Sequence, residues 1–157
     1  MSDPIVSRRK VLIASATAGA ATLAVAGAAG AARAATDPKA AVHVVYHITR
    51  GNAQASRALA NVRNHLAADP GAKIVVVGNG AGIDLLLNGA KDANGAEYAG
   101  NVGDLASRGV SFRVCENTLS NRKISKDQVL LDATTVPSGV VEAATLQYRE
   151  AYAYISP

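Results

Sequence analysis

The sequence predicts a single α/β domain built on a mostly parallel β-sheet with helices on both faces. Strand-like and helix-like segments alternate between residues 41 and 155, and parallel neighbours need helix-length crossover connections. The segment KIVVVGN at residues 73–79 is an unbroken apolar run, which is typical of a strand covered on both faces. Residues 35–157 are long enough for one hydrophobic core, and they contain no internal repeat.

The first half of the domain shows both periodicities clearly. Residues 41–48 (AVHVVYHI) are rich in β-branched and aromatic side chains and are followed by TRGN, which predicts a strand. Ala55, Leu59, Val62 and Leu66 form one stripe of an amphipathic helix over residues 53–68, which DPG ends. The strand over residues 73–79 comes next. A short helix is expected over residues 83–90, ending at Asn88-Gly89.

The second half continues the alternation with shorter elements. We expect a helix over residues 97–108, a strand over 110–115 (VSFRVC), and a short helix or turn over 116–123. A polar connection leads to a strand at 133–136, and Pro137 follows it. The last elements are a helix over 138–148, with Val141, Ala144, Thr145 and Tyr148 on one face, and a strand over 151–155.

The N-terminal residues 1–34 read as an export signal. Arg8, Arg9 and Lys10 precede an apolar run, and Ala32-Arg33-Ala34 is a small-residue exit, so cleavage is expected before Ala35. The paired arginines in SRRKVL resemble the twin-arginine type, and the location expected is therefore the periplasm or another exported site. The alternative is an uncleaved membrane anchor, since the segment is long enough to span a bilayer.

Charge and cysteine content narrow the possible partners. Residues 35–157 carry 12 Lys+Arg against 11 Asp+Glu, and there is no basic patch with interleaved aromatics, so nucleic acid is not an expected partner. One cysteine in an exported chain excludes an internal disulfide framework. It leaves a buried inert thiol, a reactive thiol or a bridge between chains.

Four features are expected at the carboxyl ends of the strands, where ligands gather in open parallel sheets. They are His47 with Arg50, the run from Asn79 to Gly82, Cys115, and the run from Pro137 to Gly139.

Cys115 is the candidate catalytic residue among them. A helix beginning at Glu116 would lower the pKa of its thiol, and Arg113 on the same face of the strand is expected to stabilise the thiolate. The alternative is a buried structural cysteine.

The other polar residues at this edge suggest a ligand site. His47, Arg50 and Asn79, with the backbone of Gly80 and Gly82, are candidates for binding a small anion. The glycines do not fit G-x-G-x-x-G, and a plain strand-to-helix turn is the alternative. His43 and His47 stand about 13 Å apart along a strand at about 3.3 Å per residue, too far to share one metal ion. No metal site and no cofactor is expected.

The order of these segments resembles the DsrE/DsrF-like proteins. The resemblance rests on HITRGNAQASRALANVRNHL, KIVVVGNGAGIDLLL, LASRGVSFRVCENTL and VPSGVVEAATLQYREAYAYISP, and covers nearly all of residues 35–157. It implies a five-stranded parallel sheet in a flavodoxin-like three-layer arrangement and assembly into homotrimers or homohexamers. In sulfur-relay members a cysteine after GV-x-hydrophobic-x-V carries a persulfide, and Cys115 in GVSFRVC matches it. Those members tend to have an Arg-Gly pair after the cysteine helix, where this chain reads NRKI.

Two functions follow as expectations. The first is a persulfide carrier or transferase, in which Cys115 exchanges sulfur with a donor and an acceptor protein. The second is a non-catalytic oligomeric protein of the periplasm that binds a small anion through His47, Arg50, Asn79 and the GNGAG backbone. A third interpretation makes Cys115 a redox sensor or an inter-chain bridge.

Overall fold

The computed structural model describes residues 40–157 of the chain. They form a five-stranded sheet in which every neighbouring pair is parallel. The elements in chain order are β1 (His43–Ile48), α1 (Asn52–Ala68), β2 (Lys73–Gly78), the 3-10 helix η1 (Gly80–Leu86), α2 (Tyr98–Ser107), β3 (Ser111–Cys115), α3 (Glu116–Asn121), the 3-10 turn η2 (Lys126–Gln128), β4 (Ala133–Val136), α4 (Gly139–Arg149) and β5 (Ala153–Ile155). The expected single α/β domain is confirmed. The export signal expected over residues 1–34 lies outside the described residues.

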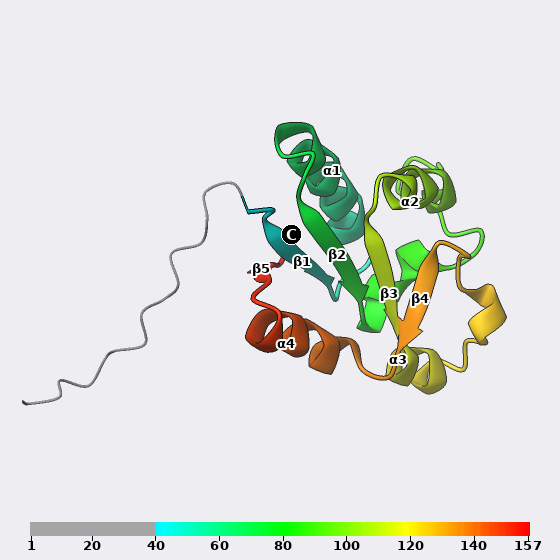
Figure 1. Ribbon diagram of the computed structural model, residues 1–157. Helices are drawn as coiled ribbons and strands as arrows, with labels where there is room; N and C mark the ends of the chain where they lie inside the picture. The colour runs from blue at the N-terminus through cyan, green and yellow to red at the C-terminus, as the bar shows by residue number, and fades with distance from the viewer. Residues whose placement is uncertain (1–39) are drawn as a thin grey trace, which may run out of the picture. The chain divides into compact units, whose positions relative to one another are not determined.

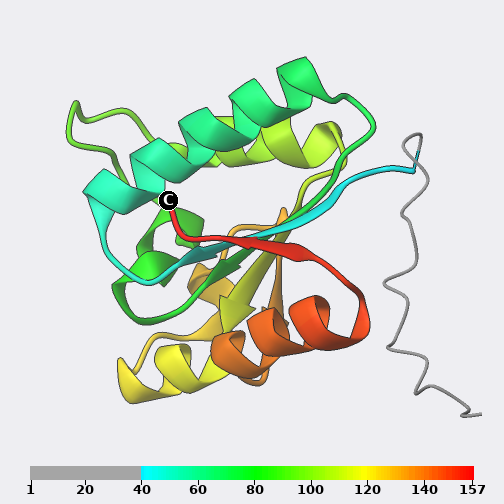
Figure 2. The same ribbon diagram turned by 90° about the vertical axis from the view of Figure 1, so that its left-hand side faces the viewer.

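The strand order is β4-β3-β2-β1-β5. The first four strands step in one direction across the sheet, and α4 then returns the chain to the opposite edge, beside β1. The three-layer arrangement is as expected, with α1 and α2 on one side of the sheet and α4 on the other (Figures 1 and 2). The order is not the 2-1-3-4-5 order of flavodoxin-like sheets. The strand order is a finding of the structure, because helix and strand periodicity does not specify which strands become neighbours.

The two faces of the sheet are covered unequally. The large hydrophobic cluster joins one face to α1, η1 and α2, and it includes Ile48, Leu59, Val76, Leu105 and Phe112. The other face has a small cluster of Val45, Val75, Val77 and Leu146, with Tyr152 packed against it. A single helix, α4, therefore covers the second face.

Two elements differ from their expected form. Residues 80–86 form a 3-10 helix that begins three residues before the expected start, directly after β2. The expected face of α4 is real, but it points to solvent: Val141 is 63% exposed and Tyr148 is 91% exposed, whereas Ala143 and Leu146 are buried against the sheet. Within residues 40–157, none of the helices combines the length and apolar character needed to cross a membrane.

The turn after β2 passes very close to the end of β1. A Cβ atom at Gly82 would lie 2.0 Å from the carbonyl oxygen of Ile48, a distance that atoms cannot share. The amide N–H of Gly82 donates to the carbonyl of Asn79 at 2.9 Å, which holds the turn tight. Glycine is therefore required here because two backbone segments touch.

We expect Gly82→Ala to destabilise the fold by about 2–3 kcal/mol, because the new methyl group must push β1 and η1 apart. Gly100→Ala is the matched control. Gly100 lies within α2 with nothing within 4 Å of the added Cβ, so alanine there should stabilise the fold by about 0.5–1 kcal/mol. Urea unfolding of both variants measures the difference, and equal midpoints would show that the close approach is not a constraint.

Candidate functional site

Cys115 is the last residue of β3 and lies directly before the first residue of α3. It pairs with Val136, the last residue of β4. The connection after β3 packs on the α1 side, since Val129 and Leu130 join the large cluster, whereas the connection after β4 runs to α4 on the other side. The connections that follow β3 and β4 therefore leave the sheet on opposite faces. Open α/β sheets bind ligands at the carboxyl ends of such a pair of strands.

Backbone N–H groups and one hydroxyl surround the sulfur. Burial by itself raises the pKa of the Cys115 thiol. Contacts from the Thr118 hydroxyl and from the backbone N–H groups of Gly139, Thr118 and Asn117 outweigh it and hold the pKa below its ordinary value. Sulfur is a weak acceptor as a thiol, and Cys115 forms no side-chain cap hydrogen bond to α3. A thiolate attracts these donors more strongly, so the arrangement favours the ionised form.

The Thr118 hydroxyl is one of the groups that lower the pKa of Cys115, and it also contacts the turn after β2. The backbone N–H of Gly80 donates to its hydroxyl oxygen at 3.0 Å, and the single hydroxyl proton is then available to Cys115. Gly80 adopts a left-handed conformation with φ of +56° in the turn after β2. The turn expected to bind an anion through its backbone therefore contacts Thr118, whose hydroxyl is among the groups that lower the pKa of Cys115.

The start of α4 covers the sulfur from the opposite side. A Cβ atom at Gly139 would lie 3.2 Å from the Cβ of Cys115 and 3.1 Å from the Cβ of Asn79, so both side chains pack directly on Gly139. Cys115 is only 4% exposed as a result. Asn117 and Pro137 beside it are exposed and form the solvent-facing rim, and the Asn117 N–H donates to the Pro137 carbonyl at 3.3 Å.

Arg113 lies on the same face of β3 as Cys115, as expected, but its charge does not act on the thiol. The guanidinium forms an ion pair with Glu142 of α4, and it is not among the groups that lower the pKa of Cys115. Glu116 is likewise paired. Hydrogen bonds from Lys126 and Thr135 lower the pKa of its carboxyl, so its charge is balanced away from the sulfur. Arg122 pairs with Asp84 at 2.6 Å.

His47 and Asn79 lie together at the same edge of the sheet. His47 is 7% exposed. Its Nδ1 lies 2.9 Å from the hydroxyl of Tyr154, and its Nε2 lies 3.0 Å from Oδ1 of Asn79. Burial lowers the pKa of His47, although the hydrogen bond with Asn79 opposes this.

Arg50 is separate from this pair. Its side chain is exposed, and its backbone N–H donates to Gln54 at 2.7 Å. The structure thus brings His47, Asn79, Cys115 and Gly139 to one edge and leaves Arg50 outside the contacts that join them.

Sequence reasoning missed Thr118 and Tyr154. Thr118 is the third residue of the helix that follows Cys115, and side chains at this position reach back to the residue that begins the helix. That spacing was the available signal. Tyr154 carried none, because only the pairing of β5 with β1 brings it to His47.

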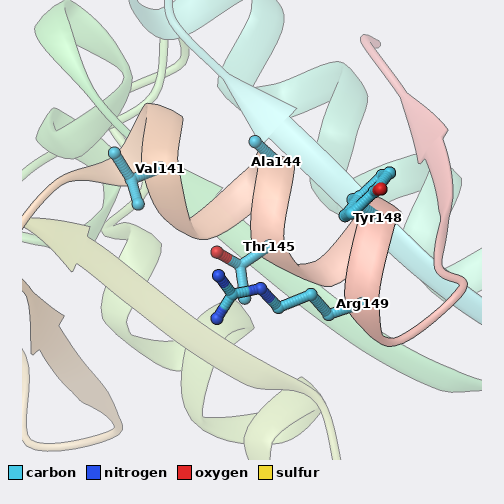
Figure 3. Close-up of a pocket in the computed structure, with 5 residues that line it drawn as sticks. All are labelled: Val141, Ala144, Thr145, Tyr148 and Arg149. Carbon is cyan, nitrogen blue, oxygen red and sulfur yellow. The ribbon is translucent and has the colours of Figure 1, made fainter.

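A separate hollow lies along the exposed side of α4. Val141, Ala144, Thr145, Tyr148 and Arg149 line it. Figure 3 shows that all five side chains come from this one helix, with Thr145 and Arg149 extending to the same side. It is a shallow groove and includes none of the residues around Cys115.

The structure is a small parallel α/β domain with a buried cysteine at the carboxyl ends of two strands whose connections leave on opposite faces of the sheet. A family model described as the DsrE/DsrF-like family matches residues 39–157, and the chain belongs to this family. Membership supports a protein of the sulfur-relay type in general.

The solved structures that are similar to the chain include the following two. One is a protein of unknown function, MTH1491 from Methanobacterium thermoautotrophicum, with 32% identity and a TM-score of 0.66 over 74% of this chain and 99% of that one. The other is the ychN protein from E. coli, with 15% identity and a TM-score of 0.56 over 74% of this chain and 97% of that one, which shows the fold alone. No curated protein matches the chain.

We expect Thr118→Val to slow alkylation of Cys115 severalfold at neutral pH. Valine keeps the shape but removes a donor that lowers the pKa of the thiol, so the pKa rises and the thiolate fraction falls. Thr118→Ser should retain most of the rate, and Thr145→Val on the exposed side of α4 serves as the control. The measurement is the alkylation rate across pH. If the alkylation rates of wild type and Thr118→Val followed the same pH profile, the Thr118 hydroxyl would have no effect on the thiol.

Proposed function

We propose that the protein is a persulfide carrier, or sulfurtransferase, that uses Cys115. The observation that carries the proposal is the set of donors around one sulfur at the carboxyl edge of the sheet, which lowers the pKa of a thiol that burial alone would raise. A structural cysteine in a core needs no such donors. Membership of the DsrE/DsrF-like family supports the same chemistry.

The transfer is a thiol–persulfide exchange. The Cys115 thiolate attacks the outer sulfur of a donor persulfide, a new S–S bond forms, the donor's S–S bond breaks, and the donor cysteine leaves as a thiolate. An acceptor thiolate then attacks the outer sulfur on Cys115, and Cys115 leaves as the thiolate. No external oxidant or reductant is consumed. A low thiol pKa assists both steps, because the thiolate is the nucleophile in the first and the leaving group in the second.

Most of the groups expected to bind a small anion already have hydrogen-bond partners within the protein. The N–H of Gly80 is bonded to Thr118, and the N–H of Gly82 is bonded to Asn79. Both ring nitrogens of His47 have partners, and Arg50 lies outside the cluster. The geometry therefore favours the carrier.

Incubation with inorganic polysulfide should load the wild-type protein with one sulfur atom on Cys115, visible by mass spectrometry of the intact chain. Cys115→Ser keeps the volume and should abolish loading entirely. Cyanide should return the loaded protein to its original mass, because it removes the outer sulfur as thiocyanate. A wild-type protein that stays unmodified where other cysteine persulfides form would refute the carrier.

We propose further that the protein forms homo-oligomers. The resemblance implied trimers or hexamers, and the exposed side of α4, with Val140, Val141 and Tyr148, offers an apolar surface that a second copy can cover. Light scattering tests this, and a monomer at micromolar concentration would contradict it.

The export signal expected over residues 1–34 extends the proposal to the periplasm or another extracytoplasmic site, where the donor and acceptor proteins would then be found. Cell fractionation should find a chain that begins near Ala35 outside the cytoplasm. A full-length chain confined to the cytoplasm would contradict export.

A further inference from the structure

Three polar side chains form a hydrogen-bonded chain along the carboxyl edge of the sheet. They come from β5, from β1 and from the residue after β2, and they run from Tyr154 through His47 to Asn79 at 2.9 and 3.0 Å. The middle member is buried and the two ends reach solvent, since Tyr154 is 43% exposed and Asn79 is half-buried. None of the three is among the groups that lower the pKa of the Cys115 thiol.

The direction of each hydrogen bond follows from the chemistry. Oδ1 of Asn79 can only accept, so Nε2 of His47 carries the proton. Burial lowers the pKa of His47, so the ring is neutral near pH 7 and Nδ1 is an acceptor. The hydroxyl of Tyr154 therefore donates to Nδ1. The hydrogen bond from His47 therefore fixes the orientation of the Asn79 amide through its oxygen. The NH₂ group of the amide points the other way and can only donate.

Asn79 lies immediately beside Cys115. Gly78 pairs with Val114 across β2 and β3, so the next residues along the two strands, Asn79 and Cys115, are neighbours. Both side chains lie on the α4 face, because both pack against Gly139. The amide is therefore next to the thiol, but it is not among the groups that hold the sulfur.

We propose that Asn79, oriented by His47 and Tyr154, donates a hydrogen bond to the outer sulfur of the Cys115 persulfide. This inference rests on the proposed carrier function. An S–S bond of about 2.05 Å places the outer sulfur beyond the N–H groups that hold the inner one. The outer sulfur of an ionised persulfide bears the negative charge and needs donors of its own. Asn79 contacts the reacting atom, and His47 and Tyr154 are positioning residues.

Asn79→Asp separates this role from a structural one. Aspartate keeps the shape and still accepts the proton of His47, but it has no N–H group and adds a negative charge beside the sulfur. We expect the preloaded persulfide of this variant to lose its outer sulfur to cyanide about tenfold faster than wild type, or more. His47→Phe frees the amide to rotate and should have a smaller effect. Tyr154→Phe removes only the distant donor and should have the smallest.

Asn64→Asp is the matched control, because Asn64 is exposed on α1 across the sheet. It should leave persulfide lifetime unchanged. Thermal unfolding of each variant checks the fold, and alkylation of the unloaded thiol across pH separates effects on the outer sulfur from effects on the thiol.

A folded Asn79→Asp variant whose persulfide lasts as long as that of wild type would overturn the inference and leave the carrier function standing. A wild-type protein that takes up no sulfur would overturn both. If Asn79→Asp fails to fold, His47→Phe takes its place because it releases the amide of Asn79, and an unchanged persulfide lifetime in that variant would overturn the inference.

Discussion

The contact between Gly139 and Cys115 is the constraint on which the site depends. The chain must cross from one edge of the sheet to the other after β4, and it enters α4 directly above the ends of β2 and β3. A Cβ atom at Gly139 would lie 3.2 Å from the Cβ of Cys115 and 3.1 Å from the Cβ of Asn79, which is closer than most side chains pack. Glycine at this position lets the start of α4 pack closely on Cys115, and the N–H of Gly139 is among the groups that lower the pKa of the thiol. The close packing of Gly139 thus provides a donor for the thiol and limits the exposure of Cys115. It also holds the side chains of Cys115 and Asn79 side by side.

The second element of the site is the turn after β2. Gly82 is required in this turn because it touches the end of β1. The same turn places the N–H of Gly80 where it donates to the hydroxyl of Thr118. The sulfur therefore receives donors from two directions, through α3 and through α4. Backbone groups fixed by the fold cost little further ordering when charge appears on the sulfur, which is why they suit a thiolate.

Much of this could be predicted from the sequence. The apolar runs fixed the strands to within a few residues, and β4 was predicted at its observed bounds, residues 133–136. Parallel alignment then placed Cys115, Asn79 and the start of α4 at one edge. The strand order could not be predicted, because residues 73–79 would read the same in any interior position. Arg113 was placed on the correct face. Its pairing with Glu142 depends on how α4 crosses the sheet, and no local pattern records that.

The unequal cover of the two faces has a further consequence for how a large donor can reach a sulfur that is 4% exposed. The helix above Cys115 is held by a small hydrophobic cluster, separate from the large one that secures α1 and α2. Segments with few buried apolar contacts open locally at a lower free-energy cost than the fold as a whole. Fewer buried apolar contacts therefore hold α4 than hold α1 and α2, so a local opening that exposes Cys115 would cost less free energy than unfolding of the whole domain.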